Sequence, residues 1–223
     1  MQSKLDAALS HQQARQAYGL LAGVLSVATR YEALATRRMI EHARFGSARS
    51  VFEFGCGTGH FGNELLTHHL PADARYTGVD LTPRMIALSR KRLARFGVRA
   101  KLHQSDGGPP ADEQARSHDR FVSNFVLDLL PEVEIEAVLA AAHRMLADDG
   151  LLCLASLAPG RGFASRRIMR VWEAIYRVTP AVVGGCRPLQ LRTLLPDSRW
   201  RVLHNEVVGP LGIPLEVVVA AKG

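Results

Sequence analysis

Five short runs with the character of β-strands divide the middle of the chain, and segments whose apolar residues recur at helical spacing lie between most of them. The runs cover residues 50–54, 75–79, 98–103, 120–125 and 151–157, and the helical segments cover 61–69, 83–96 and 132–146. Strands that alternate with helices form parallel neighbours in one sheet, with helices on both faces. This alternation predicts a doubly wound α/β fold, in which residues 104–118 form a loop in place of one helix.

The two ends of the chain depart from this alternation. Residues 200–208 and 215–221 have strand character, and the segment GPLGIP between them is too short for a crossover helix, so they are predicted to form an antiparallel hairpin. Residues 3–45 have the spacing of two helices. The expected architecture is a Rossmann-like seven-stranded sheet, mostly parallel, with a C-terminal antiparallel hairpin and an N-terminal helix pair.

Charge and cysteine content narrow the classes of function. The formal net charge of +7 raises nucleic acid as a partner, but the basic residues are scattered along the chain, which argues against one and leaves a nucleic-acid methyltransferase only as an alternative. Cys56, Cys153 and Cys186 lie far apart and form no CxxC pair, so neither a zinc site nor a disulfide framework is indicated. A cytoplasmic location is therefore expected.

A glycine-rich loop follows the first strand. The strand VFEF runs into GCGTG at residues 55–59, and a helix is predicted from residue 61. Glycines allow a sharp turn and the close approach of a ligand to the main chain, while the N-terminus of the helix offers free amide donors. Residues 57–62 also fit the dinucleotide pattern GxGxxG, so the loop alone leaves an NAD-dependent oxidoreductase open as an alternative.

Carboxylates lie at the ends of three predicted strands. Glu53 precedes the glycine loop, where it would repel a pyrophosphate and favours a ligand with a positive end. Asp80 ends the second strand, where a carboxylate can accept hydrogen bonds from both hydroxyls of a ribose. Asp106 follows the third strand and could accept from an adenine amino group. Together these acids favour an adenosine ligand that carries a positive charge.

These motifs resemble those of the class I S-adenosylmethionine-dependent methyltransferases. The resemblance extends from about residue 49 to residue 157, through VFEFGCGTG, YTGVDLTPRMIALSRKRL, HQSDGG, DRFVSNFVLDLLP and LADDGLLCLASL. It implies S-adenosyl-L-methionine as the cofactor, with its methionine end at Glu53 and the glycine loop, its ribose at Asp80 and its adenine at Ser105 and Asp106. The cofactor-binding residues that the resemblance implies are Glu53, Gly55, Cys56, Gly57, Gly59, Asp80, Leu81, Met85, Ser105, Asp106, Gly107, Asn124 and Phe125.

The same resemblance divides the chain into parts. We expect residues 1–223 to form a single methyltransferase domain. Its parts are a helical cap at 1–46, the cofactor-binding core at 49–157, a helical lid insert at 160–187 and the terminal hairpin at 200–221.

The segment after the fourth strand bears on the acceptor. SNFVLDLLP resembles the small-molecule methyltransferases that include the ubiquinone and menaquinone C-methyltransferases, and it lacks the Pro-Pro-aromatic and Pro-Cys motifs of enzymes that act on nucleobases. The resemblance implies in-line displacement to a small, apolar or lipid-like acceptor, with O-, N- and C-methylation all open. A non-catalytic module that keeps the cofactor pocket is a further alternative.

Several polar side chains are candidates for the acceptor site. The candidates for a catalytic group are Asp128, His60 and Tyr18. The candidates for contacts with the acceptor are Tyr176, Arg187 and His204. Asp128 could instead cap the helix that begins near Glu132. No metal site is expected, because the neighbouring His68 and His69 cannot face one ion together.

The insert has the pattern of an amphipathic helix. One face carries the apolar residues Ile168, Val171, Trp172, Ile175 and Val178, and the other carries Arg166, Arg167, Arg170 and Arg177. Such a helix could contact an anionic membrane through residues 161–178, or it could form a lid that packs its apolar face inward. The sequence leaves both interpretations open.

Overall fold

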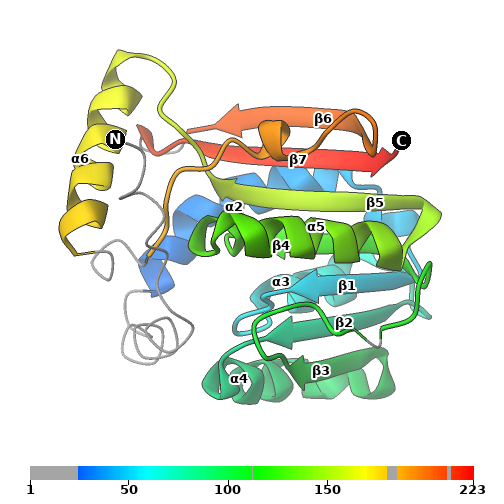
Figure 1. Ribbon diagram of the computed structural model, residues 1–223. Helices are drawn as coiled ribbons and strands as arrows, with labels where there is room; N and C mark the ends of the chain where they lie inside the picture. Colours follow the sequence, from blue (N-terminus) through cyan, green and yellow to red (C-terminus); the bar gives the residue numbers. More distant parts are fainter. Residues whose placement is uncertain (1–24, 112, 180–184, 210–211) are drawn as a thin grey trace.

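All seven predicted strands join one sheet in the computed structural model, which describes residues 25–111, 113–179, 185–209 and 212–223 (Figure 1). The strand order is β3-β2-β1-β4-β5-β7-β6. The strands are β1 Ser50–Phe54, β2 Arg75–Asp80, β3 Ala100–Gln104, β4 His118–Asn124, β5 Leu146–Leu157, β6 Trp200–Val208 and β7 Leu215–Lys222. The first five pair in parallel, and β7 pairs antiparallel with both β5 and β6. The predicted fold class is therefore confirmed.

Helices cover both faces of this sheet. They are α2 Leu25–His42, α3 His60–Glu64, α4 Pro83–Leu93, α5 Glu132–Met145 and α6 Phe163–Val178. A π-helical turn, Leu65–His69, continues α3, and a 3₁₀ segment, Ala94–Arg99, follows α4. Figure 1 shows α5 across the near face of the sheet and α6 at the end toward which β1 and β2 point.

The core forms two layers because successive side chains of a strand point to opposite faces. Val51 of β1 packs in a cluster with Met39 of α2 and Phe61 of α3, whereas the adjacent Phe52 packs in a second cluster with Ile135 of α5. These side chains are buried. The central strand β1 is thus held from both faces, and the loop at its carboxyl end starts from a rigid position.

The start of β5 is the strand boundary that differs most from the sequence-based expectation. β5 begins at Leu146 rather than at Leu151, because the chain becomes extended directly at the end of α5, where Leu146 has φ −68° and ψ 138°. Of the predicted N-terminal helix pair, only α2 lies within the described residues. Residues 1–24, and with them the candidate Tyr18, lie outside them.

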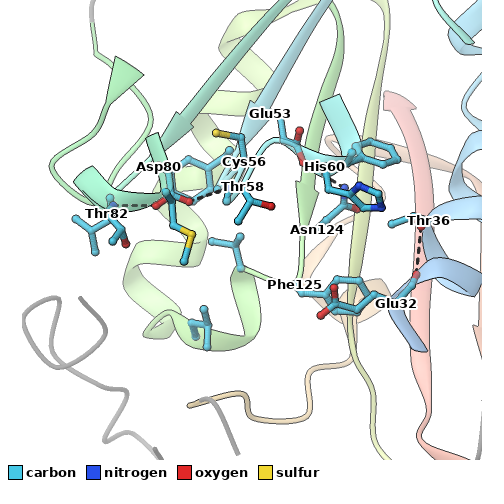
Figure 2. A pocket seen from close by; sticks show the side chains of 18 of the residues that line it. Glu32, Thr36, Glu53, Cys56, Thr58, His60, Asp80, Thr82, Asn124 and Phe125 are labelled. Atoms are coloured by element: carbon cyan, nitrogen blue, oxygen red, sulfur yellow. Dashed lines mark hydrogen bonds between the residues drawn. The ribbon is translucent and has the colours of Figure 1, made fainter. Parts of the chain in front are cut away.

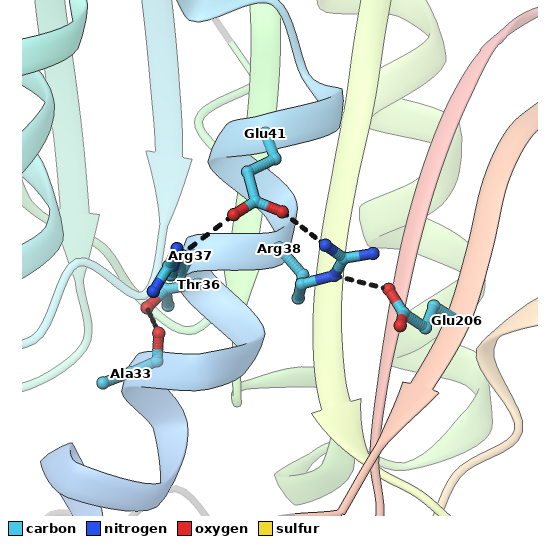
Figure 3. A network of polar contacts seen from close by, with 6 residues as sticks. All are labelled: Ala33, Thr36, Arg37, Arg38, Glu41 and Glu206. Atoms are coloured by element: carbon cyan, nitrogen blue, oxygen red, sulfur yellow. Dashed lines mark hydrogen bonds and ion pairs between the residues drawn. The ribbon is translucent and has the colours of Figure 1, made fainter.

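The helix α2 is fastened to the terminal hairpin by a polar network (Figure 3). The Nε atom of Arg38 donates to Oε2 of Glu206 on β6 at 2.7 Å, and its Nη1 atom donates to Glu41 at 2.5 Å. Arg37 binds the other oxygen of Glu41 at 3.1 Å. Ala35 and Met39 of the same helix are fully buried. These contacts hold α2 in place beside the carboxyl edge of the sheet.

Candidate functional site

A cavity of about 780 Å³ opens at the carboxyl ends of the parallel strands, where ligands bind in doubly wound folds. Its walls come from the loop after β1, the ends of β2 and β4, the helix α2 and the start of α5. The lining residues include Glu32, Thr36, Ile40, Glu53, Gly55, Cys56, Gly57, His60, Asp80, Met85, Ser105, Asn124, Phe125, Leu129, Leu130 and Glu134. The cavity is therefore lined both by residues of the predicted cofactor motifs and by residues that lie outside those motifs.

The three glycines of the loop have different physical roles. Gly55, Gly57 and Gly59 all have positive φ, at 77°, 51° and 74°. A Cβ atom at Gly55 would lie 2.2 Å from Cγ2 of Val126, and one at Gly59 would lie 2.9 Å from Cβ of Ser89. At Gly57 nothing lies within 4 Å of that position. Packing thus requires Gly55 and Gly59, whereas Gly57 leaves open space for a ligand to approach the main chain.

Asp80 closes the other side of this loop (Figure 2). Its Oδ2 atom accepts from the backbone N–H of Gly57 at 3.0 Å, and its Oδ1 atom accepts from the N–H of Thr82 at 2.8 Å. Each oxygen keeps a second lone pair for a ligand hydroxyl. Burial raises the pKa of Asp80 above its usual value, and the hydrogen bonds from Thr82 and Gly57 oppose that shift.

Glu53 is 2% exposed beneath the glycine loop. It accepts a short hydrogen bond from the hydroxyl of Tyr76 and a weaker one from Nδ2 of Asn124, at 3.4 Å. Burial raises the pKa of Glu53 to about 7, although these two hydrogen bonds oppose the shift. The Oδ1 atom of Asn124 is buried with no hydrogen-bond partner among the described residues. A buried acid and an orphaned acceptor side by side suit a cationic ligand that donates hydrogen bonds.

Most of the predicted cofactor residues meet at this cavity. Those that line it are Glu53, Gly55, Cys56, Gly57, Asp80, Leu81, Met85, Ser105, Gly107, Asn124 and Phe125. Gly59 supports the loop from behind, against Ser89. Asp106 is exposed and is not among the lining residues, because the turn after β3 places its neighbours Ser105 and Gly107 there instead. Phe125 has a φ of 55°, a rare conformation for a residue with a side chain.

The two catalytic candidates within the described residues, His60 and Asp128, differ in their surroundings. His60 is exposed at the start of α3 and lines the cavity. Asp128 is fully buried and is not a lining residue; its Oδ2 atom accepts from the N–H of Leu157 at 3.2 Å. The expected helix cap is wrong, since Pro131 occupies the cap position of α5 without a side-chain hydrogen bond. Asp128 instead connects the end of β4 to the end of β5.

None of the acceptor candidates lines the cavity. Tyr176 is buried on α6, and His204 on β6 stacks on His42 with ring centroids 3.6 Å apart. Arg187 donates to the carbonyl oxygen of Leu130 at 2.6 Å, so it supports the wall from outside. Its neighbour Cys186 does reach the cavity.

His42, His204 and Glu206 are grouped closely enough to be considered as ion ligands, with ligand atoms within 4.8 Å of one another. The two imidazole planes are nearly parallel, at 11°, so their lone pairs do not converge. Glu206 is also bound by Arg38. This group lies outside the cavity, and its geometry does not suit an ion.

The residues that sequence reasoning missed lie mainly on α2 and at the start of α5. Glu32, Thr36 and Ile40 follow one another at intervals of one helical turn and face the cavity, as Leu129 and Glu134 do from the other side. The four-residue spacing was visible in the sequence. However, it does not indicate which loop or strand a helix faces.

The insert helix α6 also differs from one prediction. The apolar residues Ile168, Val171, Ile175 and Val178 are exposed by 38%, 61%, 37% and 84%. The residues of α6 that are buried are Met169 and Tyr176, while Trp172 is partly buried and donates to the carbonyl oxygen of Cys186 at 2.9 Å. A lid that packs its whole apolar face inward is therefore wrong for the described residues. The helix packs on one edge of that face.

Comparison with known proteins identifies the core. Residues 51–150 match the family model described as a methyltransferase domain. This segment is a class I S-adenosylmethionine-dependent methyltransferase domain. Its cofactor is S-adenosylmethionine, which carries a methyl group on a positively charged sulfur. The methyltransferase domain thus comprises the strands and helices that surround the glycine loop.

Individual relatives agree with this assignment. The chain is 33% identical over 140 residues to the carboxy-S-adenosyl-L-methionine synthase of Chromohalobacter salexigens, and 37% identical over 132 residues to the malonyl-[acyl-carrier protein] O-methyltransferase of Laribacter hongkongensis. The matches cover 61% and 56% of this chain but only 46% and 42% of those proteins. The chain therefore matches less than half of the length of each of these curated relatives.

The fold has solved counterparts as well. Magnesium protoporphyrin IX methyltransferase from Synechocystis, with S-adenosylhomocysteine bound, superposes with a TM-score of 0.63 at 15% identity, covering 88% of this chain and 84% of that one. At this level of identity the likeness concerns the fold alone. Among the described residues, no helix is both long and apolar enough to cross a membrane.

The cavity fits the cofactor on its own structural features. The open space at Gly57 lets an S-adenosylmethionine molecule approach the main chain. The free lone pairs of Asp80 can accept hydrogen bonds from its ribose hydroxyls. The buried pair of Glu53 and Asn124 can bind its cationic end. A Cβ atom at Gly62, the third glycine of the GxGxxG pattern, would lie 2.5 Å from Cζ of Tyr76, so the close packing of α3 on β2 requires this glycine.

Proposed function

We propose that the protein transfers a methyl group from S-adenosylmethionine, by in-line displacement, to a small acceptor of apolar or lipid-like character. The main observation behind this proposal is that one cavity has two parts. One part is lined by Glu53, Asp80 and the open main chain at Gly57. The other part, toward α2 and the start of α5, includes the apolar side chains of Ile40, Leu129 and Leu130. An acceptor held there would lie next to the methyl group.

The residues of the chain have distinct roles in this reaction. Glu53 and Asn124 hold the cationic end of the cofactor, and Asp80 holds its ribose hydroxyls. The helix α2, fixed by Arg38 and buried at Met39, closes the acceptor part and limits the entry of water. Displacement at a methyl group depends mainly on this alignment and enclosure.

The test is a binding and transfer assay with matched variants. Asp80→Ala should weaken S-adenosylhomocysteine binding about 100-fold, since two charge-assisted hydrogen bonds are lost. Asp73→Ala is the control, because Asp73 is exposed just before β2, at the other end of that strand. Transfer of labelled methyl groups into a lipid extract completes the assay.

The proposal fails if wild-type protein does not bind S-adenosylhomocysteine, or if Asp80→Ala binds it as tightly as wild type. Binding without transfer to any of a broad set of acceptors would instead favour the non-catalytic alternative.

We also propose that α6 brings the protein to an anionic membrane, which would supply a lipid-like acceptor. Its exposed stripe of Ile168, Val171, Ile175 and Val178 borders Arg166, Arg167, Arg170 and Arg177, with Glu173 as the one acid of the helix. An apolar stripe flanked by arginines is typical of helices that lie in the lipid interface.

Vesicle sedimentation tests this surface. Wild-type protein should sediment with phosphatidylglycerol vesicles and not with phosphatidylcholine vesicles, and Val171→Asp combined with Val178→Asp should abolish the effect. Binding to RNA but not to vesicles would overturn the membrane proposal and revive the nucleic-acid alternative.

A further inference from the structure

Glu32 of α2 is one of the acids in the cavity that no cofactor motif explains. Figure 2 shows it beside Phe125, across the cavity from Asp80. The only hydrogen bond of Glu32 within the described residues uses its backbone carbonyl, which accepts from the hydroxyl of Thr36 at 3.2 Å. Its carboxylate has no hydrogen bond or ion pair to any described residue. No described residue therefore competes with a molecule in the cavity for this carboxylate.

The surroundings of Glu32 weaken its acidity. Burial, together with the charge of Asp128, raises the pKa of Glu32 to about 7. A carboxylate with such a pKa accepts a proton readily near neutral pH, which is the property of a general base. The other ionisable side chains that line this part of the cavity are Arg37, Glu41, His60, Glu64, His69 and Glu134.

The balance of charge in the acceptor part is acidic. Arg37 is the one Lys or Arg among the described lining residues, and Glu41 binds it at 3.1 Å. Glu64 lies 3.2 Å from His69, and Glu32 and Glu134 add two further carboxylates. A carboxylate or phosphate acceptor would therefore enter a wall of like charge in which the paired Arg37 is the one described arginine.

We infer that Glu32 is a catalytic base of this site, and that the acceptor is an uncharged or cationic, largely apolar molecule whose attacking atom is the nitrogen of an amine or the oxygen of a phenol. This inference rests on the proposed methyl transfer. In the reaction the acceptor heteroatom forms a bond to the methyl carbon while the bond from that carbon to sulfur breaks. The electron pair of the broken bond stays on the sulfur, which becomes neutral, and the proton of the acceptor passes to the Glu32 carboxylate.

A set of matched ligands tests the acceptor class. Phenylethylamine, 4-ethylphenol and phenylacetate share a ring and a short chain and differ in charge. On protein saturated with S-adenosylhomocysteine, we expect phenylethylamine and 4-ethylphenol to bind and phenylacetate not to bind, as measured by ligand-observed NMR. Glu32→Gln should weaken the binding of phenylethylamine about tenfold, because one charged hydrogen bond is lost. Glu136→Gln, on the exposed face of α5 and outside the cavity lining, is the control and should leave this affinity unchanged.

Turnover provides a second measurement. With a ligand of the set that is methylated, kcat should rise with pH through about 7 in wild type, whereas Glu32→Gln should lower kcat about 100-fold and remove this rise. Binding of phenylacetate as tight as that of phenylethylamine, absence of binding by all three, or an unchanged Glu32→Gln would overturn the inference. Failure of the underlying methyltransferase proposal is separate, because it would appear as a loss of S-adenosylhomocysteine binding in wild type.

Discussion

The two halves of the cavity are built in different ways. The cofactor half consists of strand ends and the loops that directly follow them, so Glu53, the glycine loop and Asp80 are positioned by the hydrogen bonding of the sheet itself. The acceptor half depends on α2 and the start of α5, which reach the cavity through packing and through the contact between Arg38 and Glu206. The geometry of the first half is therefore set by the sheet, whereas that of the second depends on how the helices pack.

Substitutions in the glycine loop are expected to have the largest effects on stability and on cofactor binding. Gly55→Ala should destabilise the protein by about 3 kcal/mol, because an added Cβ would meet Val126 and the positive φ would be strained. Gly57→Ala should lower stability by about 1 kcal/mol, since only its φ is unfavourable, yet it should weaken S-adenosylmethionine binding at least tenfold. Urea denaturation and calorimetry measure the two effects. Equal losses of stability in both variants would contradict the separate roles of these glycines.

Glu53 gives a prediction of intermediate size. Because burial raises its pKa to about 7, the carboxylate is charged in only part of the molecules at neutral pH. A cationic cofactor binds the charged form, so affinity for S-adenosylmethionine should rise between pH 6 and pH 8 and should level off above that range.

Glu53→Gln should remove this dependence and weaken binding about tenfold at pH 8. The stability of the protein without cofactor should have the opposite dependence on pH. Since the folded state binds the proton more tightly than the unfolded state, stability should fall as pH rises from about 5 to above 7, and the variant should reduce that fall. An unchanged pH profile of both quantities in the variant would show that Glu53 does not cause them.

Substitution of Asp106 is expected to change cofactor affinity least. It tests a role that the family resemblance implies but that the position of the side chain does not support. The family resemblance assigns it to the adenine, whereas its side chain is exposed and outside the lining of the cavity. Asp106→Ala should therefore change S-adenosylhomocysteine affinity less than about threefold. A loss near that of Asp80→Ala would support the assignment made from the sequence.

Sequence patterns were sufficient to predict the sheet and the glycine loop at its edge. The strands, the hairpin and the glycine loop depend on local alternation and turn chemistry, which are written in adjacent residues. The role of Glu32 depends on where α2 packs, and the exposure of Val171 and Val178 depends on which edge of α6 packs on the protein. Both are tertiary relationships, and an amphipathic pattern alone cannot specify them.

The most direct test of the central claim is a calorimetric titration of the full chain with S-adenosylmethionine and, separately, with NAD. We predict saturable binding of one S-adenosylmethionine per chain, weakened about 100-fold by Asp80→Ala and unaffected by Glu32→Gln, and no binding of NAD. Binding of NAD, or no binding of S-adenosylmethionine, would contradict the assignment of this cavity.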